Sequence, residues 1–207
     1  MKNIIEILKK NPIQIENFLE LDVANSIYEI IEDKAVWDII STTKGTYTDE
    51  IQKNKNKEFS FWFSVNTNEK LLKKCLLNSN FFIELIKLFN NEYLEFDKES
   101  PHLSMFKFGN FLSPHNDING VRKYAFIYNL TKDAEEHKGG CLKFINKKNE
   151  IVFSFPPIFN SLTIFDVYNT PYEHLVTEVI DKNYSRYAIS GWLVDAEKSV
   201  KIKKTML

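Results

Sequence analysis

The stretch HLSMFKFGNFLSPHNDING, residues 102–120, sets the pattern for the second half of the chain. MFKFG (105–109) alternates between apolar and polar residues as a half-buried β-strand does, and NDING (116–120) is typical of a turn. If a strand continues through His115 and Asp117, both side chains point from one face, because side chains repeat every two residues along a strand. Two such donors can hold a metal ion, or they can be two polar residues beside a turn.

Short β-rich runs of this kind fill the chain from about residue 101 to 194, separated by Gly, Pro, Asn and Asp. Their number and spacing predict an antiparallel sandwich or barrel. The first hundred residues instead place apolar side chains three and four apart, as helices do. We expect helices within residues 3–10, 22–34 and 66–91, and a strand at 58–65. The expected fold class is therefore α+β, with the helices packed on one face of the β-structure.

A length of 207 residues suits one domain, 1–207, in which 1–100 is mainly helical support with some strand, 101–194 is the β-rich core and 195–207 is a solvated tail. Lys plus Arg (27) nearly balances Asp plus Glu (28), so we expect neither a nucleic-acid nor a membrane partner. The opening segment is too short and too charged for a secretory leader, and no later stretch is apolar enough to cross a membrane. Cys75 and Cys141 lie far apart and are expected to be free thiols, which favours a cytoplasmic protein. The oligomeric state is left open.

A second histidine and an arginine favour the interpretation of His115 and Asp117 as metal ligands. His174 opens the β-run HLVTEVI, and Arg186 opens RYAISGWLV twelve residues later, after the turn-like DKNYS. This is hairpin spacing, so the two residues are expected on neighbouring antiparallel strands. Two histidines and a carboxylate with open positions opposite form the facial triad of non-haem Fe(II) oxygenases, although a tetrahedral zinc site can use the same three ligands.

Arg186 favours iron with an α-keto acid, because a guanidinium binds the far carboxylate of a dicarboxylic keto acid through two parallel hydrogen bonds. Along its strand, Ala188, Ser190 and Trp192 share the face of Arg186. The small side chains of Ala188 and Ser190 leave room for a slender cosubstrate, and Trp192 is placed to close the pocket.

The order of motifs FLSPHND, RKYAFIYNLTKD, GGCLKF, FNSLTIFD, HLVTEV and SRYAISGW resembles the prolyl-hydroxylase-like branch of 2-oxoglutarate- and Fe(II)-dependent dioxygenases, over roughly residues 101–194. The resemblance implies a double-stranded β-helix, or jelly roll, with N-terminal supporting helices. It also implies Fe(II) as cofactor, with 2-oxoglutarate and dioxygen as cosubstrates. By the same resemblance His115, Asp117 and His174 are the iron ligands, and Arg186 holds the 2-oxoglutarate carboxylate.

The resemblance extends to further positions of the cosubstrate pocket. In AFIYNL the residues Ala125, Ile127 and Asn129 would point inward. Asn129 stands where oxygen-sensing relatives often carry a tyrosine, and a one-residue shift would offer Tyr128 for that contact instead. The remaining pocket residues expected by resemblance are Leu142 beside the cosubstrate, Ser190 and Trp192, with Arg122 at the barrel mouth as a substrate contact and residues 45–58 as a substrate-covering loop.

The function implied is hydroxylation of an unactivated C–H bond, with decarboxylation of 2-oxoglutarate to succinate, because the carboxylate that halogenating relatives lose is present as Asp117. The leading substrate is a prolyl residue in a protein or peptide. A free amino acid or other small metabolite is the alternative within the same class. A non-catalytic or zinc- or manganese-binding jelly-roll module is the alternative from another class.

Overall fold

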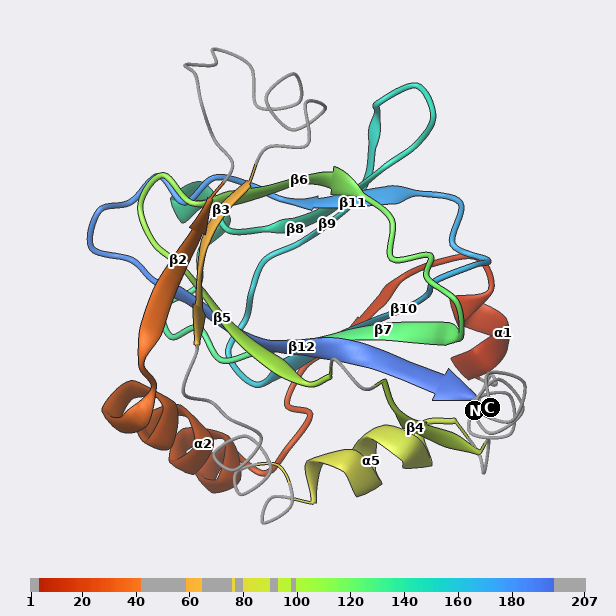
Figure 1. Ribbon diagram of the computed structural model, residues 1–207, viewed down its shortest axis with the longest axis horizontal. Helices are drawn as coiled ribbons and strands as arrows, with labels where there is room; N and C mark the ends of the chain where they lie inside the picture. The colour runs from red at the N-terminus through yellow and green to blue at the C-terminus, as the bar shows by residue number, and fades with distance from the viewer. Residues whose placement is uncertain are drawn as a thin grey trace, which may run out of the picture.

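Two facing layers of antiparallel strands form the centre of the molecule in the computed structural model, which describes residues 4–41, 59–64, 76, 80–89, 93–97 and 100–195 (Figure 1). The strands of one layer are β5 (His102–Phe106), β7 (Arg122–Asn129), β10 (Ser161–Asp166) and β12 (Arg186–Asp195). Those of the other layer are β6 (Phe111–His115), β8 (Leu142–Ile145), β9 (Ile151–Phe155) and β11 (Glu173–Val176). β3 (Phe59–Ser64) pairs with both β5 and β6 and joins the layers along one side. This arrangement confirms the predicted double-stranded β-helix.

The N-terminal hundred residues extend these layers as well as supporting them. β1 (Ile13–Ile15) pairs with β10, β2 (Trp37–Ser41) pairs with β3, and β4 (Leu94–Phe96) pairs with β12. The strand expected at 58–65 is confirmed as β3. The N-terminal segment therefore adds four strands in its described part, more than the sequence pattern indicated.

Helices cover the outer face of the layer that β5, β7, β10 and β12 form. They are α1 (Ile4–Leu8), α2 (Leu21–Lys34) and α5 (Phe81–Lys87), and a single 3-10 turn, η1, spans Glu136–Lys138. Ala24, Ile27 and Ile31 of α2 are buried at spacings of three and four, as the sequence predicts. None of the helices in the part of the chain that the structure describes is long and apolar enough to span a membrane. Residues 42–58, 65–75 and 196–207, which include the expected covering loop, Cys75 and nearly all of the tail, lie outside the described residues.

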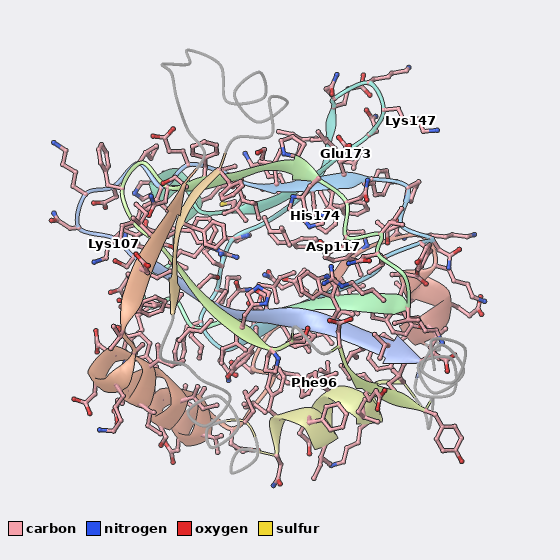
Figure 2. All side chains as sticks on the ribbon, in the orientation of Figure 1. Phe96, Lys107, Asp117, Lys147, Glu173 and His174 are labelled. Carbon is pink, nitrogen blue, oxygen red and sulfur yellow. The ribbon has the colours of Figure 1, made fainter. Side chains whose placement is uncertain are left out.

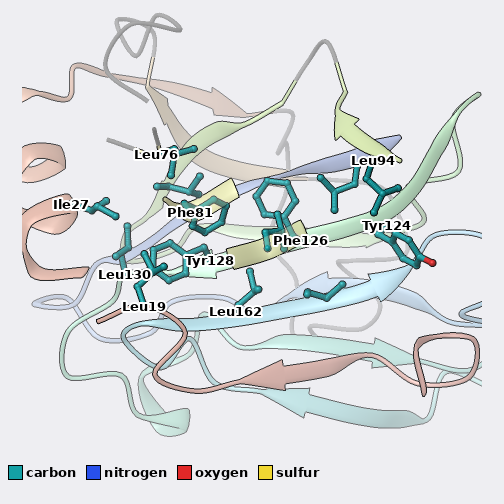
Figure 3. Packing of buried hydrophobic residues seen from close by; sticks show 14 of the residues in the cluster. Leu19, Ile27, Leu76, Phe81, Leu94, Tyr124, Phe126, Tyr128, Leu130 and Leu162 are labelled. Carbon is teal, nitrogen blue, oxygen red and sulfur yellow. The ribbon is translucent and has the colours of Figure 1, made fainter. Parts of the chain in front are cut away.

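Alternate side chains of strand β7 belong to two different hydrophobic clusters, one on each face of its layer. Tyr124, Phe126 and Tyr128 point outward into the cluster that the helices cover (Figure 3). Ala125 and Ile127 point inward, between the two layers. The alternation confirms the predicted inner and outer faces of this strand.

The predicted hairpin between His174 and Arg186 is wrong. β11 is paired on one side with β6 and on the other with β8, so it has no free edge for β12. β12 lies in the opposite layer, between β5 and β7. Residues 177–185 therefore cross from one layer to the other, and His174 and Arg186 approach the space between the layers from opposite sides.

Candidate metal and cosubstrate site

Three potential metal ligands meet between the layers, at one end of β6 and β11. His115 is the last residue of β6 and is paired in register with His174 of β11, and the two imidazole centroids lie 4.1 Å apart. Asp117 follows two residues after β6, so it reaches the site from a turn and not from the strand itself. Its Oδ1 lies 3.6 Å from Nε2 of His115, and its Oδ2 lies 3.5 Å from Nε2 of His174. One ligand atom from each residue falls within 4.8 Å of the others, so the structure brings the predicted triad together.

Both histidines turn Nε2 towards Asp117. Nδ1 of His115 lies 2.8 Å from the carbonyl oxygen of Ser113, to which it donates, so Nε2 is the nitrogen that faces Asp117. His174 is buried between the rings of Phe144 and Phe165, and this burial lowers its pKa to about 3, so it is neutral at pH 7. In Figure 2 His174 and Asp117 lie together between the layers, whereas the neighbouring Glu173 points to the outside.

Asp117 is held as a carboxylate. Burial alone would raise its pKa, but attraction to His174 and His115, a hydrogen bond from the Trp192 side chain and the nearby Arg122 together keep the pKa below its ordinary value. Two imidazoles and one carboxylate on the same side suit a ferrous ion that keeps open positions opposite them. The residues present therefore fit the metal that the sequence pattern indicates.

A cavity of about 310 Å³ opens from this triad into the space between the layers. Such a volume suits a small ligand. Its walls are mostly apolar, and the predicted residues Ile127, Leu142, Ser190 and Trp192 all line it, together with Arg186.

Arg186 is a buried guanidinium with no carboxylate beside it among the described residues. Its side chain stands over the ring of Phe106, 4.9 Å from the centroid, and only 3% of the residue is exposed. Burial lowers its pKa to about 10, and its Nε has no hydrogen-bond partner in the described part of the chain. Because buried charges are normally paired, this arrangement indicates that the cavity receives an anion.

Three other predicted residues do not line the cavity. The Tyr128 hydroxyl donates to Oδ1 of Asn160 (2.9 Å) on the helix-covered side, so this expectation is wrong. Asn129 is on the inner face, but its amide donates to the Ser161 hydroxyl (3.1 Å). Arg122 is engaged outside the cavity, with its guanidinium carbon 3.4 Å from the Trp192 ring centroid and its Nε 3.8 Å from Asp97. Tyr128 faces outward by the period of β7, whereas Asn129 and Arg122 are engaged by residues distant in the sequence, which strand periodicity does not reveal.

The sequence pattern missed other residues of the site. His102 and Ser104 line the cavity because β5 pairs with β12, which places His102 opposite Ser190 and Ser104 opposite Ala188. Tyr184 does not line the cavity but joins the inner hydrophobic cluster beside it. Its position two residues before Arg186 was the available signal, because residues two apart in an extended chain share a face.

Comparison with known proteins agrees with this geometry. A sequence model of the 2OG-Fe(II) oxygenase superfamily matches residues 101–194. The chain is 31% identical over 150 residues to prolyl 3-hydroxylase sudestada1 of Drosophila melanogaster, an alignment that covers 65% of this chain and 27% of the relative. The chain thus spans about a quarter of the length of that curated relative.

Solved structures show the same fold. An oxidoreductase of the 2OG-Fe(II) oxygenase family from Burkholderia pseudomallei superposes with a TM-score of 0.65 at 10% identity, covering 89% of this chain and 85% of the other. A prolyl hydroxylase from Trichoplax adhaerens, solved with a peptide fragment of the hypoxia inducible factor oxygen degradation domain, gives a TM-score of 0.60 at 16% identity, covering 90% and 84%. Residues 101–194 are thus similar in sequence to the 2OG-Fe(II) oxygenase superfamily, and the chain shares its fold with the solved 2OG-Fe(II) oxygenase and prolyl hydroxylase structures.

Proposed function

We propose that this chain is an Fe(II)- and 2-oxoglutarate-dependent dioxygenase that hydroxylates a prolyl residue in a protein or peptide. One observation carries the proposal: a two-histidine, one-carboxylate cluster faces the same cavity as a buried guanidinium whose Nε has no hydrogen-bond partner among the described residues, and the two come from opposite layers of the fold. The first suits a ferrous ion, and the second suits the remote carboxylate of a keto diacid.

In this proposal His115, Asp117 and His174 hold the iron. When bound, the iron supplies the activation of dioxygen that is coupled to decarboxylation of 2-oxoglutarate to succinate. The protein's own part is to fix the ligands. The Ser113 carbonyl sets the tautomer of His115, and the side chain of Trp192 orients Asp117.

Arg186 is proposed to bind the remote carboxylate of 2-oxoglutarate. Leu142 and Ile127 then flank the carbon chain of the cosubstrate, and their apolar surface excludes water from it. Ser190 and Trp192 line the same cavity farther along β12.

The prolyl substrate is supported by the relatives rather than by a contact in the site. The curated relative is a prolyl 3-hydroxylase, and the Trichoplax structure is a prolyl hydroxylase in complex with a peptide fragment. The chain spans only a quarter of the first of these, so the substrate and the activity of the whole protein are proposed from the domain that they share.

The test begins with anaerobic addition of Fe(II) and 2-oxoglutarate to the purified chain. A weak visible charge-transfer band is expected, because the keto acid binds a ferrous ion directly. His174→Ala should abolish the band, since it removes one of the three ligands. No band from correctly folded wild-type protein would contradict the proposal and favour a zinc- or manganese-binding module.

The substrate is tested separately by adding oxygen and candidate prolyl peptides. Mass spectrometry should detect a gain of one oxygen atom on a peptide, with succinate released in equal amount. A gain on free amino acids and never on peptides would retain the oxygenase and overturn the prolyl-peptide assignment.

A further inference from the structure

Two polar side chains line the cavity in addition to the metal cluster and Arg186. His102 of β5 and Ser190 of β12 both line it, and the two residues are paired in register on neighbouring strands. The hydroxyl of Ser104, which also lines the cavity from β5, is engaged within the fold, because it donates to the carbonyl oxygen of Ala188 (3.5 Å). The His102–Ser190 pair is thus a polar part of the cavity wall with no role in the proposed binding of iron or cosubstrate.

The His102–Ser190 pair lies beyond the reach of a cosubstrate held at Arg186. Arg186 is paired with Phe106, and the His102–Ser190 pair follows four residues farther along the same two strands. Four residues span about 13 Å of strand, which is more than a five-carbon chain covers. Arg186 and Phe106 are buried, whereas His102 and Ser190 are half-buried, so the pair stands at the more open end of the cavity.

Trp192 connects this pair to the metal cluster. Its ring centroid lies 5.5 Å from that of His102, and its side chain donates a hydrogen bond to Asp117. All three side chains line the same cavity. A molecule that lies against the His102–Ser190 pair is therefore beside the metal ligands, which is the position that a C–H bond must take in order to be oxidised there.

A prolyl residue within a peptide suits the chemistry of this pair. Its ring nitrogen carries no hydrogen, so the backbone on the two sides of the ring offers carbonyl oxygens and no N–H of its own. An imidazole and a hydroxyl can each donate a hydrogen bond to a carbonyl oxygen. Free proline instead carries an ammonium group and a carboxylate, which call for charged partners.

We propose that His102 and Ser190 bind the substrate by donating hydrogen bonds to the carbonyl oxygens that flank its prolyl ring. This inference rests on the proposed function and deepens it, because such a pair selects a peptidyl proline over the free amino acid. The two residues bind and orient the substrate, and they hold neither iron nor cosubstrate.

The experiment titrates a capped peptide, acetyl-alanyl-prolyl-alanine amide, into the chain loaded with Fe(II) and 2-oxoglutarate under argon, with calorimetric detection. His102→Phe keeps a ring against Trp192 but has no nitrogen, so it should bind the peptide about fivefold more weakly, the usual effect of losing one hydrogen bond. Ser190→Ala should show a similar loss. His102→Gln retains an N–H donor and should recover most of the affinity. His137→Phe is the matched control, because His137 is exposed in η1, and its peptide affinity should equal that of the wild type.

The affinity for 2-oxoglutarate separates a substrate contact from a structural role. In the anaerobic charge-transfer titration, His102→Phe and Ser190→Ala should stay within twofold of the wild type, because both positions lie four residues from the pairing of Arg186 with Phe106. A large loss of 2-oxoglutarate binding in either variant would show a structural role and overturn the inference.

The remaining outcomes distinguish this inference from the proposed function. The inference would be overturned, with the proposed function intact, if the wild type bound 2-oxoglutarate but not the capped peptide. The same conclusion would follow if the variants bound the peptide as tightly as the wild type, or if free L-proline bound the wild type as tightly as the peptide does. Failure of the wild type to bind 2-oxoglutarate would overturn both.

Discussion

Replacing Arg186 by methionine should make the ligand-free protein more stable and the cosubstrate bind far more weakly. Burial lowers the pKa of Arg186 from 12.5 to about 10, and this difference corresponds to a cost of roughly 3 kcal/mol for keeping the charge in the folded state. Methionine removes that cost but loses the contact of the guanidinium with the Phe106 ring, worth about 1 kcal/mol. The expected net gain in unfolding free energy is therefore about 2 kcal/mol, measured by urea denaturation at pH 7.

The same substitution should weaken binding of 2-oxoglutarate by at least about 30-fold, because truncating one partner of a buried charge pair costs 2 kcal/mol or more. The anaerobic charge-transfer titration measures this loss. Arg122→Met is the matched control. Arg122 is also buried but is paired with Asp97 and stacked on Trp192, so its loss should reduce the unfolding free energy by roughly 2 kcal/mol or more.

Two results would refute this reasoning. If Arg186→Met destabilised the ligand-free protein as much as Arg122→Met does, the Arg186 guanidinium would have a partner within the chain. If 2-oxoglutarate bound equally well to Arg186→Met and to the wild type, the anion that the cavity receives would not be this diacid.

Asn160→Gly, which keeps the left-handed backbone (φ 58°), should reduce the unfolding free energy by roughly 3 kcal/mol, because the Asn160 side chain accepts from the Leu19 amide and the Tyr128 hydroxyl and donates to the Leu19 carbonyl. Tyr128→Phe removes one of these bonds and should cost about 1 kcal/mol in the same denaturation assay, so equal losses would contradict the account. The metal-free protein should lose stability as the pH falls below 6.5, because the unfolded chain protonates His174 whereas the fold, with its pKa lowered to about 3, does not. The loss at pH 5.5 should be roughly 1.4 kcal/mol relative to pH 8 and absent in His174→Gln; an identical pH profile for both proteins would show that His174 is not the cause.

The parts of the fold set by local periodicity could be predicted from the sequence. The alternation along 122–129 gave the inner and outer faces of β7, and the three- and four-residue spacing of Ala24, Ile27 and Ile31 gave the buried face of α2. The metal cluster was also predictable, because His115 and Asp117 are fixed by the end of a single strand and the start of a turn.

The remainder depended on pairings between distant strands. A separation of twelve residues between His174 and Arg186 allows either a hairpin or a crossing between layers. The chain crosses because β6 and β8 occupy both edges of β11 and leave none for β12. His102 reached the cavity only through the pairing of β5 with β12. Asn129 was turned away by a hydrogen bond to Ser161, a partner 32 residues away in the sequence.

The metal cluster sits on β6 and β11 and the turn after β6, whereas Arg186 sits on β12, in the opposite layer. The distance from the chelating end of a ligand to its anchoring end is therefore set by the separation of two rigid sheets, which pack about 10 Å apart, and not by any flexible loop. A keto diacid that binds both the metal cluster and Arg186 would therefore have its length selected by the fold, and diacids one methylene shorter or longer than 2-oxoglutarate should bind more weakly. Segments at the surface could then vary with the molecule to be oxidised without altering the binding of the cosubstrate.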